Sequence, residues 1–139
     1  MSPWEVNLVQ FIDDCAEGSI TEPTAALTNF AALARCAPPE FAGLFDRFPD
    51  EARVAKLIEA DAFVTASMEM VGPYCGILLT RSATGTSSGL VTISNEVEEG
   101  SFFCEDPAVA VLGAFARALL ALGSDPMFRE PPTPSGMLS

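Results

Sequence analysis

Residues 106–123, DPAVAVLGAFARALLALG, constrain the fold more than any other part of the chain. The segment has a strong helix start, because Asp106 is a good N-cap and Pro107 suits the first helical position. Arg117 is its one basic residue, so the predicted helix is apolar on nearly every side. We therefore predict a helix that ends at Gly123 and is covered on more than one side. Its main apolar stripe comprises Ala108, Leu112, Phe115, Leu119 and Leu122.

The N-terminal residues predict a second well-defined helix. Ser2 and Glu5 have the spacing of a capping box, and Pro3 lies at the first helical position. Gly18 is suited to end this helix. Its apolar stripe comprises Trp4, Leu8, Phe11, Ile12 and Cys15.

Three further helical segments are predicted before residue 61. One begins at Thr21 and stops before Pro38, a second covers 40–48, and a third follows Pro49–Asp50. The segment 40–48 carries four large apolar side chains at helical spacing, which suits either the core or a partner groove, and the core is the favoured assignment. These side chains are Phe41, Leu44, Phe45 and Phe48.

The pattern changes near Asp61. Apolar and polar side chains alternate through Met70, which favours a strand with one wet face, although a continuation of the preceding helix is the alternative. Gly72–Pro73 indicate a turn. Further strands are predicted over 74–81, 89–94 and 101–104. Their connections are too short for crossovers, so the sheet should be an antiparallel meander.

These patterns predict an α+β fold. It should contain three or four N-terminal helices, an antiparallel meander of three or four strands, and the long C-terminal helix packed on the sheet. At 139 residues the chain should form one domain over 1–123. Residues 124–139 contain four prolines and are predicted to be a flexible tail.

Charge restricts the function. Nineteen acidic residues face seven basic ones, for a formal net charge of −12. Such a surface repels nucleic-acid phosphates and anionic membranes and attracts basic partners. The sequence has neither a long uncharged apolar run nor the basic start of a secretory signal. We therefore expect a cytoplasmic protein that binds no membrane and makes no direct contact with nucleic acid.

The sequence offers little reactive chemistry. It has no histidine, which removes the usual general base and the commonest metal ligand. No calcium-loop spacing and no phosphate-binding glycine motif occurs. We therefore expect no catalytic residue, no metal and no cofactor, and a paired-carboxylate hydrolase is the alternative. The cysteines are widely spaced and should be reduced, mostly buried thiols; they are Cys15, Cys36, Cys75 and Cys104.

The acids gather in two tracts beside apolar stripes. Residues 1–34 contain five acids and no base, and residues 94–116 contain another five and no base. The acids near the C-terminal end of the first predicted helix interact unfavourably with the helix dipole, and this indicates a cationic partner at that end. The alternative is a solvated acidic surface that keeps the domain soluble. The candidate partner contacts are Asp13, Asp14, Glu17, Glu96, Glu98 and Glu99.

The stretch FCEDPAVAVLGAFARALLALG, preceded by VTASMEMVGP, resembles small uncharacterised phage and prophage proteins of the α-β-α sandwich type. The resemblance covers residues 62–122 and lies mainly in apolar periodicity, and the helical first half departs from that pattern. It carries no functional residue across. It implies a phage origin, and small acidic phage proteins include inhibitors of host defence such as anti-CRISPRs.

Charge and resemblance together predict a non-enzymatic inhibitor that acts by protein–protein interaction in a bacterial host. Its partner would be a basic protein or ribonucleoprotein complex that handles nucleic acid, masked by a surface that mimics nucleic acid. Two alternatives are a small acidic chaperone of the secretion-chaperone type and an immunity protein against a basic nuclease toxin. The oligomeric state is left open, and a homodimer is one alternative.

Overall fold

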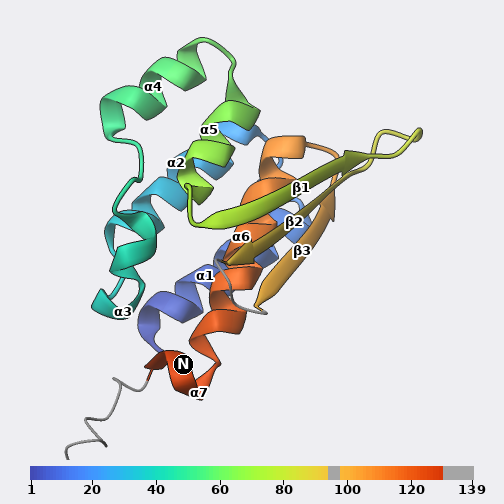
Figure 1. Ribbon diagram of the computed structural model, residues 1–139. Coiled ribbons are helices and arrows are strands. Elements are labelled where there is room, and N and C mark those ends of the chain that lie inside the picture. Colours follow the sequence, from blue (N-terminus) through green and yellow to red (C-terminus); the bar gives the residue numbers. More distant parts are fainter. Residues whose placement is uncertain (94–97, 130–139) are drawn as a thin grey trace, which may run out of the picture.

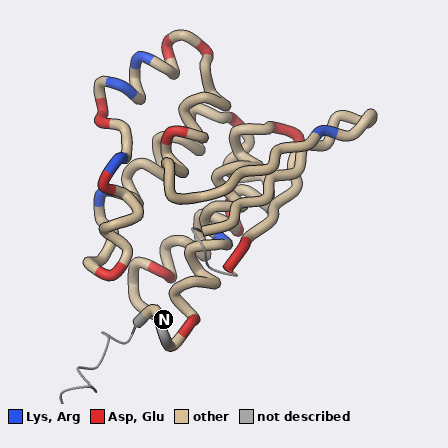
Figure 2. Tube along the Cα trace, viewed as in Figure 1, with Lys and Arg blue, Asp and Glu red and all other residues tan. Residues whose placement is uncertain are grey.

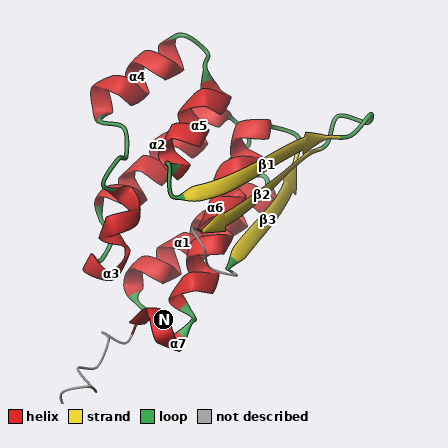
Figure 3. Ribbon diagram, viewed as in Figure 1, coloured by secondary structure: helices red, strands yellow, loops and turns green. Residues whose placement is uncertain are grey.

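The computed structural model describes residues 1–93 and 98–129, which form the α+β fold that the sequence predicts (Figure 3). The first half is helical: α1 (Pro3–Glu17), α2 (Pro23–Arg35), α3 (Pro39–Ala42), the 3-10 turn η1 (Gly43–Phe45), α4 (Glu51–Glu59) and α5 (Phe63–Val71). The second half contains β1 (Cys75–Arg81), β2 (Ser87–Ile93), β3 (Glu99–Cys104), α6 (Pro107–Gly123) and α7 (Pro126–Arg129). Within the described residues, none of the helices has the length and apolar character needed to cross a bilayer.

Helix α6 lies at the centre of the molecule, between the sheet and the N-terminal helices (Figure 1). One side of α6 packs on β2 and β3, and its other sides pack on α1, α2 and α5. All residues from 108 to 116 are buried, and Arg117 is the first exposed residue of the helix after them. The prediction that this helix is covered on more than one side is therefore confirmed.

The capping box of α1 forms as predicted. The Glu5 backbone N–H donates to Ser2 Oγ at 3.3 Å, and the Ser2 N–H donates to Glu5 Oε1 at 3.1 Å. Gly18 ends the helix in the left-handed conformation, with φ 89°. The indole of Trp4 donates to the Leu33 carbonyl at 2.7 Å, which fixes α1 against α2. The helix caps thus set the direction in which α1 enters the core.

The strands form one antiparallel sheet in the order β1–β2–β3. Two glycines let this sheet approach α6 closely. A Cβ on Gly89 would lie 2.6 Å from the carbonyl oxygen of Ala110, and a Cβ on Gly100 would overlap the backbone of Ala114 and Ala118. The sheet and the helix therefore meet backbone to backbone, and larger side chains at these two positions would push them apart.

The prediction of a strand over residues 61–70 is wrong, because this segment forms α5. The Ser67 side chain, which an alternating strand places on the wet face, is fully buried, and its hydroxyl donates to the Val64 carbonyl at 2.7 Å. Contacts with α6, α2 and α4 stabilise the helical conformation. The buried residues recur at helical spacing and are Ala66, Ser67, Met70 and Val71.

Helix α5 is also separate from the helix before it. Helix α4 ends at Glu59, and Asp61 has a φ of 54°, which breaks the helical path. Two hydrogen bonds then hold the helices together, from Arg53 Nε and Nη2 to the Glu69 carboxylate at 3.0 and 2.7 Å. This ion pair favours the charged carboxylate and lowers the pKa of Glu69.

The aromatic side chains of residues 41–48 belong to the core, as favoured. Phe41 is fully buried and its ring centroid lies 4.7 Å from that of Trp4. Phe128 of α7 also packs on Phe41, at 5.0 Å between centroids. The predicted tail thus begins, over residues 124–129, with a turn and a short helix held against the fold. Leu44, Phe45 and Phe48 are half-buried and pack against the core.

Candidate partner-binding site

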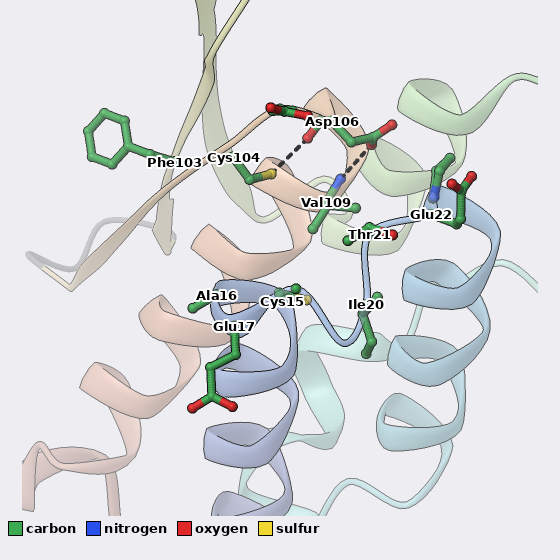
Figure 4. A pocket seen from close by; sticks show the side chains of 13 residues that line it. Cys15, Ala16, Glu17, Ile20, Thr21, Glu22, Phe103, Cys104, Asp106 and Val109 are labelled. Carbon is green, nitrogen blue, oxygen red and sulfur yellow. Dashed lines mark hydrogen bonds between the residues drawn. The ribbon is translucent and has the colours of Figure 1, made fainter.

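A pocket of about 570 Å³ opens where the connection from α1 to α2 meets the turn from β3 to α6 (Figure 4). Residues far apart in the sequence therefore form its walls. One wall is made by Cys15, Ala16, Glu17, Gly18, Ile20, Thr21, Glu22 and Pro23, and the other by Phe103, Cys104, Glu105, Asp106 and Val109.

Among the described residues, four carboxylates and no basic side chain line this pocket. They belong to Glu17, Glu22, Glu105 and Asp106. The ion pairs within residues 1–93 and 98–129 lie elsewhere, between α2 and α4 and between α4 and α5. No cation of the described chain thus neutralises the pocket, which favours a positively charged ligand group. We refer to these four residues and the cavity between them as the acidic pocket.

Two of these carboxylates each belong to an acid–proline pair at the start of a helix. Glu22 and Pro23 open α2, and Asp106 and Pro107 open α6. The Val109 N–H donates to Asp106 Oδ1 at 3.0 Å, so this side chain caps its own helix. Glu22 makes no such cap bond. The carboxylate of Glu22 is therefore the better placed of the two to bind a group from outside.

The end of α1 adds further negative potential. Its last turn contains no basic residue, and the C-terminal end of a helix carries a partial negative charge. Asp14 lies in this turn and accepts a hydrogen bond from Gln10 Nε2 at 2.9 Å. Glu17 follows and lines the acidic pocket. A cation bound beside the end of α1 would interact favourably with Glu17 and with this helix end, whereas the starts of α2 and α6 at the same pocket carry partial positive charge.

Two neutral thiols lie in the pocket wall. Burial, together with the neighbouring Cys104 and Asp14, raises the pKa of Cys15 to about 12. Burial also raises the pKa of Cys104, whose Sγ donates to the Asp106 carbonyl at 3.0 Å. Both thiols therefore stay protonated near neutral pH and contribute apolar surface rather than a nucleophile.

The pocket combines an apolar wall with an acidic rim. Cys15 and Ile20 are buried on one side, and Val109 is buried on the other. Lysine and arginine have an apolar stem and a charged head, which match these two parts. Among the described residues, no three Cys, Asp or Glu side chains come close enough together to bind a metal ion. The chemistry of the pocket thus suits reversible binding of a basic side chain.

The structure separates the predicted contact residues into two groups. Asp13 and Asp14 lie on α1 beside Glu17, next to the acidic pocket. Glu98 and Glu99 lie at the start of β3, whereas the pocket lies at the end of that strand. Glu96 lies outside the described residues. The prediction therefore names one residue of the pocket lining, Glu17, and a separate pair at the far end of β3.

Sequence reasoning did not assign Glu22, Glu105 or Asp106 to a partner-binding site. Two acid–proline pairs, each at a predicted helix start, are the signal that could have identified them. Proline fixes the first helical turn and thereby fixes the preceding acid at the helix end. The sequence contains no information that these two helix ends are neighbours, because that depends on how α1 and α2 pack on α6.

The basic residues gather on a different part of the molecule. Four of the seven lie within residues 35–56, and Figure 2 shows this part of the trace along α4 and the segment before it. They are Arg35, Arg47, Arg53 and Lys56. The acidic pocket is formed by other elements, so the charge of the described chain is distributed unevenly.

Comparison of the chain with protein-family models, curated proteins and solved structures gives no match. The resemblance to phage proteins therefore stays a prediction, and the acidic pocket is the basis for a functional proposal.

Proposed function

We propose that this protein binds a basic surface of another protein or ribonucleoprotein through its acidic pocket and performs no catalysis of its own. The observation that carries this proposal is the unneutralised group of carboxylates around a cavity with apolar walls. An arginine or lysine of the partner would insert its stem between Ile20 and Val109 and place its cation beside Glu22 and Glu105. The resulting charge-assisted hydrogen bonds are stronger than neutral ones.

The biological consequence would be inhibition by masking. Surfaces lined by arginine and lysine commonly serve to hold the nucleic-acid backbone. A negatively charged protein that covers such a surface competes with nucleic acid for the same cations. The net charge of −12 would also speed the encounter with a basic complex. We extend the proposal to a nucleic-acid-handling complex of host defence, on the basis of the resemblance to phage proteins.

The first test is a matched pair of charge reversals. A fluorescein-labelled nona-arginine peptide serves as the probe, and its affinity is measured by fluorescence anisotropy at low salt. The double variant Glu22→Lys/Glu105→Lys removes two carboxylates of the acidic pocket. The control Glu51→Lys/Glu59→Lys changes the net charge equally at two exposed positions of α4.

We expect the pocket variant to bind the peptide about tenfold more weakly than the control does, a difference of about 1.4 kcal/mol. Long-range attraction changes equally in both variants, so the difference reports local contacts. Circular dichroism checks that both variants are folded. Equal loss of affinity in the two variants would show that binding depends on net charge alone and would contradict the proposed site.

A further inference from the structure

The two edges of the sheet differ in how they are protected. On β3, Arg117 Nη1 donates to the outward-facing carbonyl of Ser101 at 2.8 Å. The same guanidinium lies over the Phe102 ring, with its carbon 4.8 Å from the centroid. A cation fixed in this position occupies the hydrogen-bonding edge of β3. Natural sheets use such charged side chains to prevent an edge from pairing with another chain.

The outer edge of β1 has no such protecting side chain among the described residues. The Ser82 N–H donates to the Thr86 carbonyl and so defines which residues of the hairpin bond to each other. Because hydrogen-bonded positions alternate along an antiparallel pair, Ile77 and Leu79 direct their N–H and C=O groups away from β2. Among the described residues, no hydrogen bond from outside the hairpin reaches these two positions.

The side chains of β1 also leave this edge available. Leu78 is 57% exposed on the face of the sheet away from α6, and Ile77 and Leu79 are half-buried on the other face. Helix α6 packs mainly on β2 and β3. A hollow of about 390 Å³ adjoins the end of the strand, between Val64 and Leu79. The strand thus has an apolar surface that the helices cover in part.

The sequence around β1 is exceptional in charge. Residues 70–95 contain no acidic residue and one basic residue, Arg81, although the chain has nineteen acids. Two copies of a protein with net charge −12 repel each other over most orientations. The β1–β2 hairpin is a stretch of the sequence that brings no carboxylate of its own to a contact between two copies. The acids next to this hairpin lie at the two ends of β1: Glu105 lines the hollow beside Leu79 and Arg81, and Asp46 accepts a hydrogen bond from the Tyr74 hydroxyl.

We propose that β1 is a homodimer interface, in which it pairs antiparallel with β1 of a second copy. The pairing joins the two sheets into one continuous sheet. A register centred on Leu78 sets Ile77 of each copy opposite Leu79 of the other and overlaps the whole strand. A register centred on Leu79 would instead set Ile77 against Arg81. The apolar match favours the first register.

No residue of β1 lines the acidic pocket, but Glu105 of that pocket also borders the hollow beside Leu79 and Arg81, so the interface is tested separately from peptide binding. The molar mass in solution tests it directly, by light scattering during size-exclusion chromatography over a range of concentrations. We expect the mass of the full chain to rise from one to two copies of 14.7 kDa as concentration increases. A single-copy mass at millimolar concentration would overturn the proposal. It would do so even if β1 of the monomer bound an extended peptide, because the proposed occupant is a second copy.

Two lysine substitutions test which edge of the sheet forms the interface. Leu78→Lys sets two cations opposite each other at the proposed centre and should raise the dimer dissociation constant by about tenfold or more. Phe103→Lys is the matched control, because Phe103 is 67% exposed on the same face of the sheet but lies on β3. It should leave dimerisation unchanged. A dimer that resists Leu78→Lys, or that is lost equally in the control, overturns the β1 interface.

A disulfide tests the register. Leu78 would be a non-hydrogen-bonded pair with its own copy, with Cα atoms about 4.5 Å apart, which is within the range for a disulfide. Leu78→Cys should therefore give a covalent dimer under mild oxidation, in a Cys36→Ser background that removes the exposed native thiol. Phe103→Cys in the same background should give none. Equal crosslinking of the two variants would overturn the register centred on Leu78.

Discussion

The contrast between Cys15 and Cys36 shows how the environment of one residue can remove its chemistry. Cys15 lies at the inner wall of the acidic pocket, where burial and nearby negative charge disfavour the thiolate. A pKa of about 12 leaves the thiol protonated throughout the physiological range. Cys36 is exposed at the end of α2 and lacks this protection. The prediction that the four thiols are mostly buried is wrong, because Cys15 is buried whereas Cys36 is exposed and Cys75 and Cys104 are intermediate.

This difference predicts an order of alkylation. With iodoacetamide at pH 8, native protein should be modified first at Cys36, and Cys15 should stay unmodified until the protein is denatured. At pH 9 Cys15 should still be modified far more slowly than Cys36, because well below its pKa the Cys15 thiolate is a very small fraction, although that fraction rises about tenfold per pH unit. Mass spectrometry of peptides after timed quenching measures both sites. Rapid modification of Cys15 in folded protein would contradict its burial and raised pKa.

At the scale of elements, local signals explain α1 and α6 and fail at α5. Caps and prolines determine where α1 and α6 begin. These interactions lie within one helical turn, so nearby residues alone are enough to predict both helices. Nine residues with mixed spacing do not distinguish a strand from a helix. The conformation of α5 follows from packing against α6 and from the ion pair with α4, both of which are long-range.

Because β3 lies very close to α6, we predict that one added methyl group on β3 lowers the free energy of unfolding. Gly100→Ala should destabilise the protein by about 3 kcal/mol, because the added Cβ would overlap the α6 backbone rather than a flexible side chain. Gly43→Ala is the control, since a Cβ there meets nothing within 4 Å. Urea unfolding followed by circular dichroism measures both variants. Similar midpoints for the two would show that the sheet and helix are less tightly packed than described.

At the scale of the whole molecule, the proposed binding site depends on which acids the fold brings together. The charge imbalance predicts a basic partner from composition, but composition places no residue in space. Glu17 and Glu22 line the same pocket as Glu105 and Asp106 because α1, α2 and β3 all pack around α6. Glu98 and Glu99 are equally acidic in sequence and lie at the other end of β3. Predicting the site therefore requires the tertiary contacts that sequence patterns do not encode.

One measurement tests the acidic pocket most directly: titration of ¹⁵N-labelled protein with nona-arginine peptide, followed by two-dimensional ¹H–¹⁵N NMR. We predict that the largest shifts fall on the backbone amides of residues 15–22 and 103–109, in both segments together. Shifts confined to residues 98–99, or spread evenly over all acidic segments, would contradict the acidic pocket as the binding site.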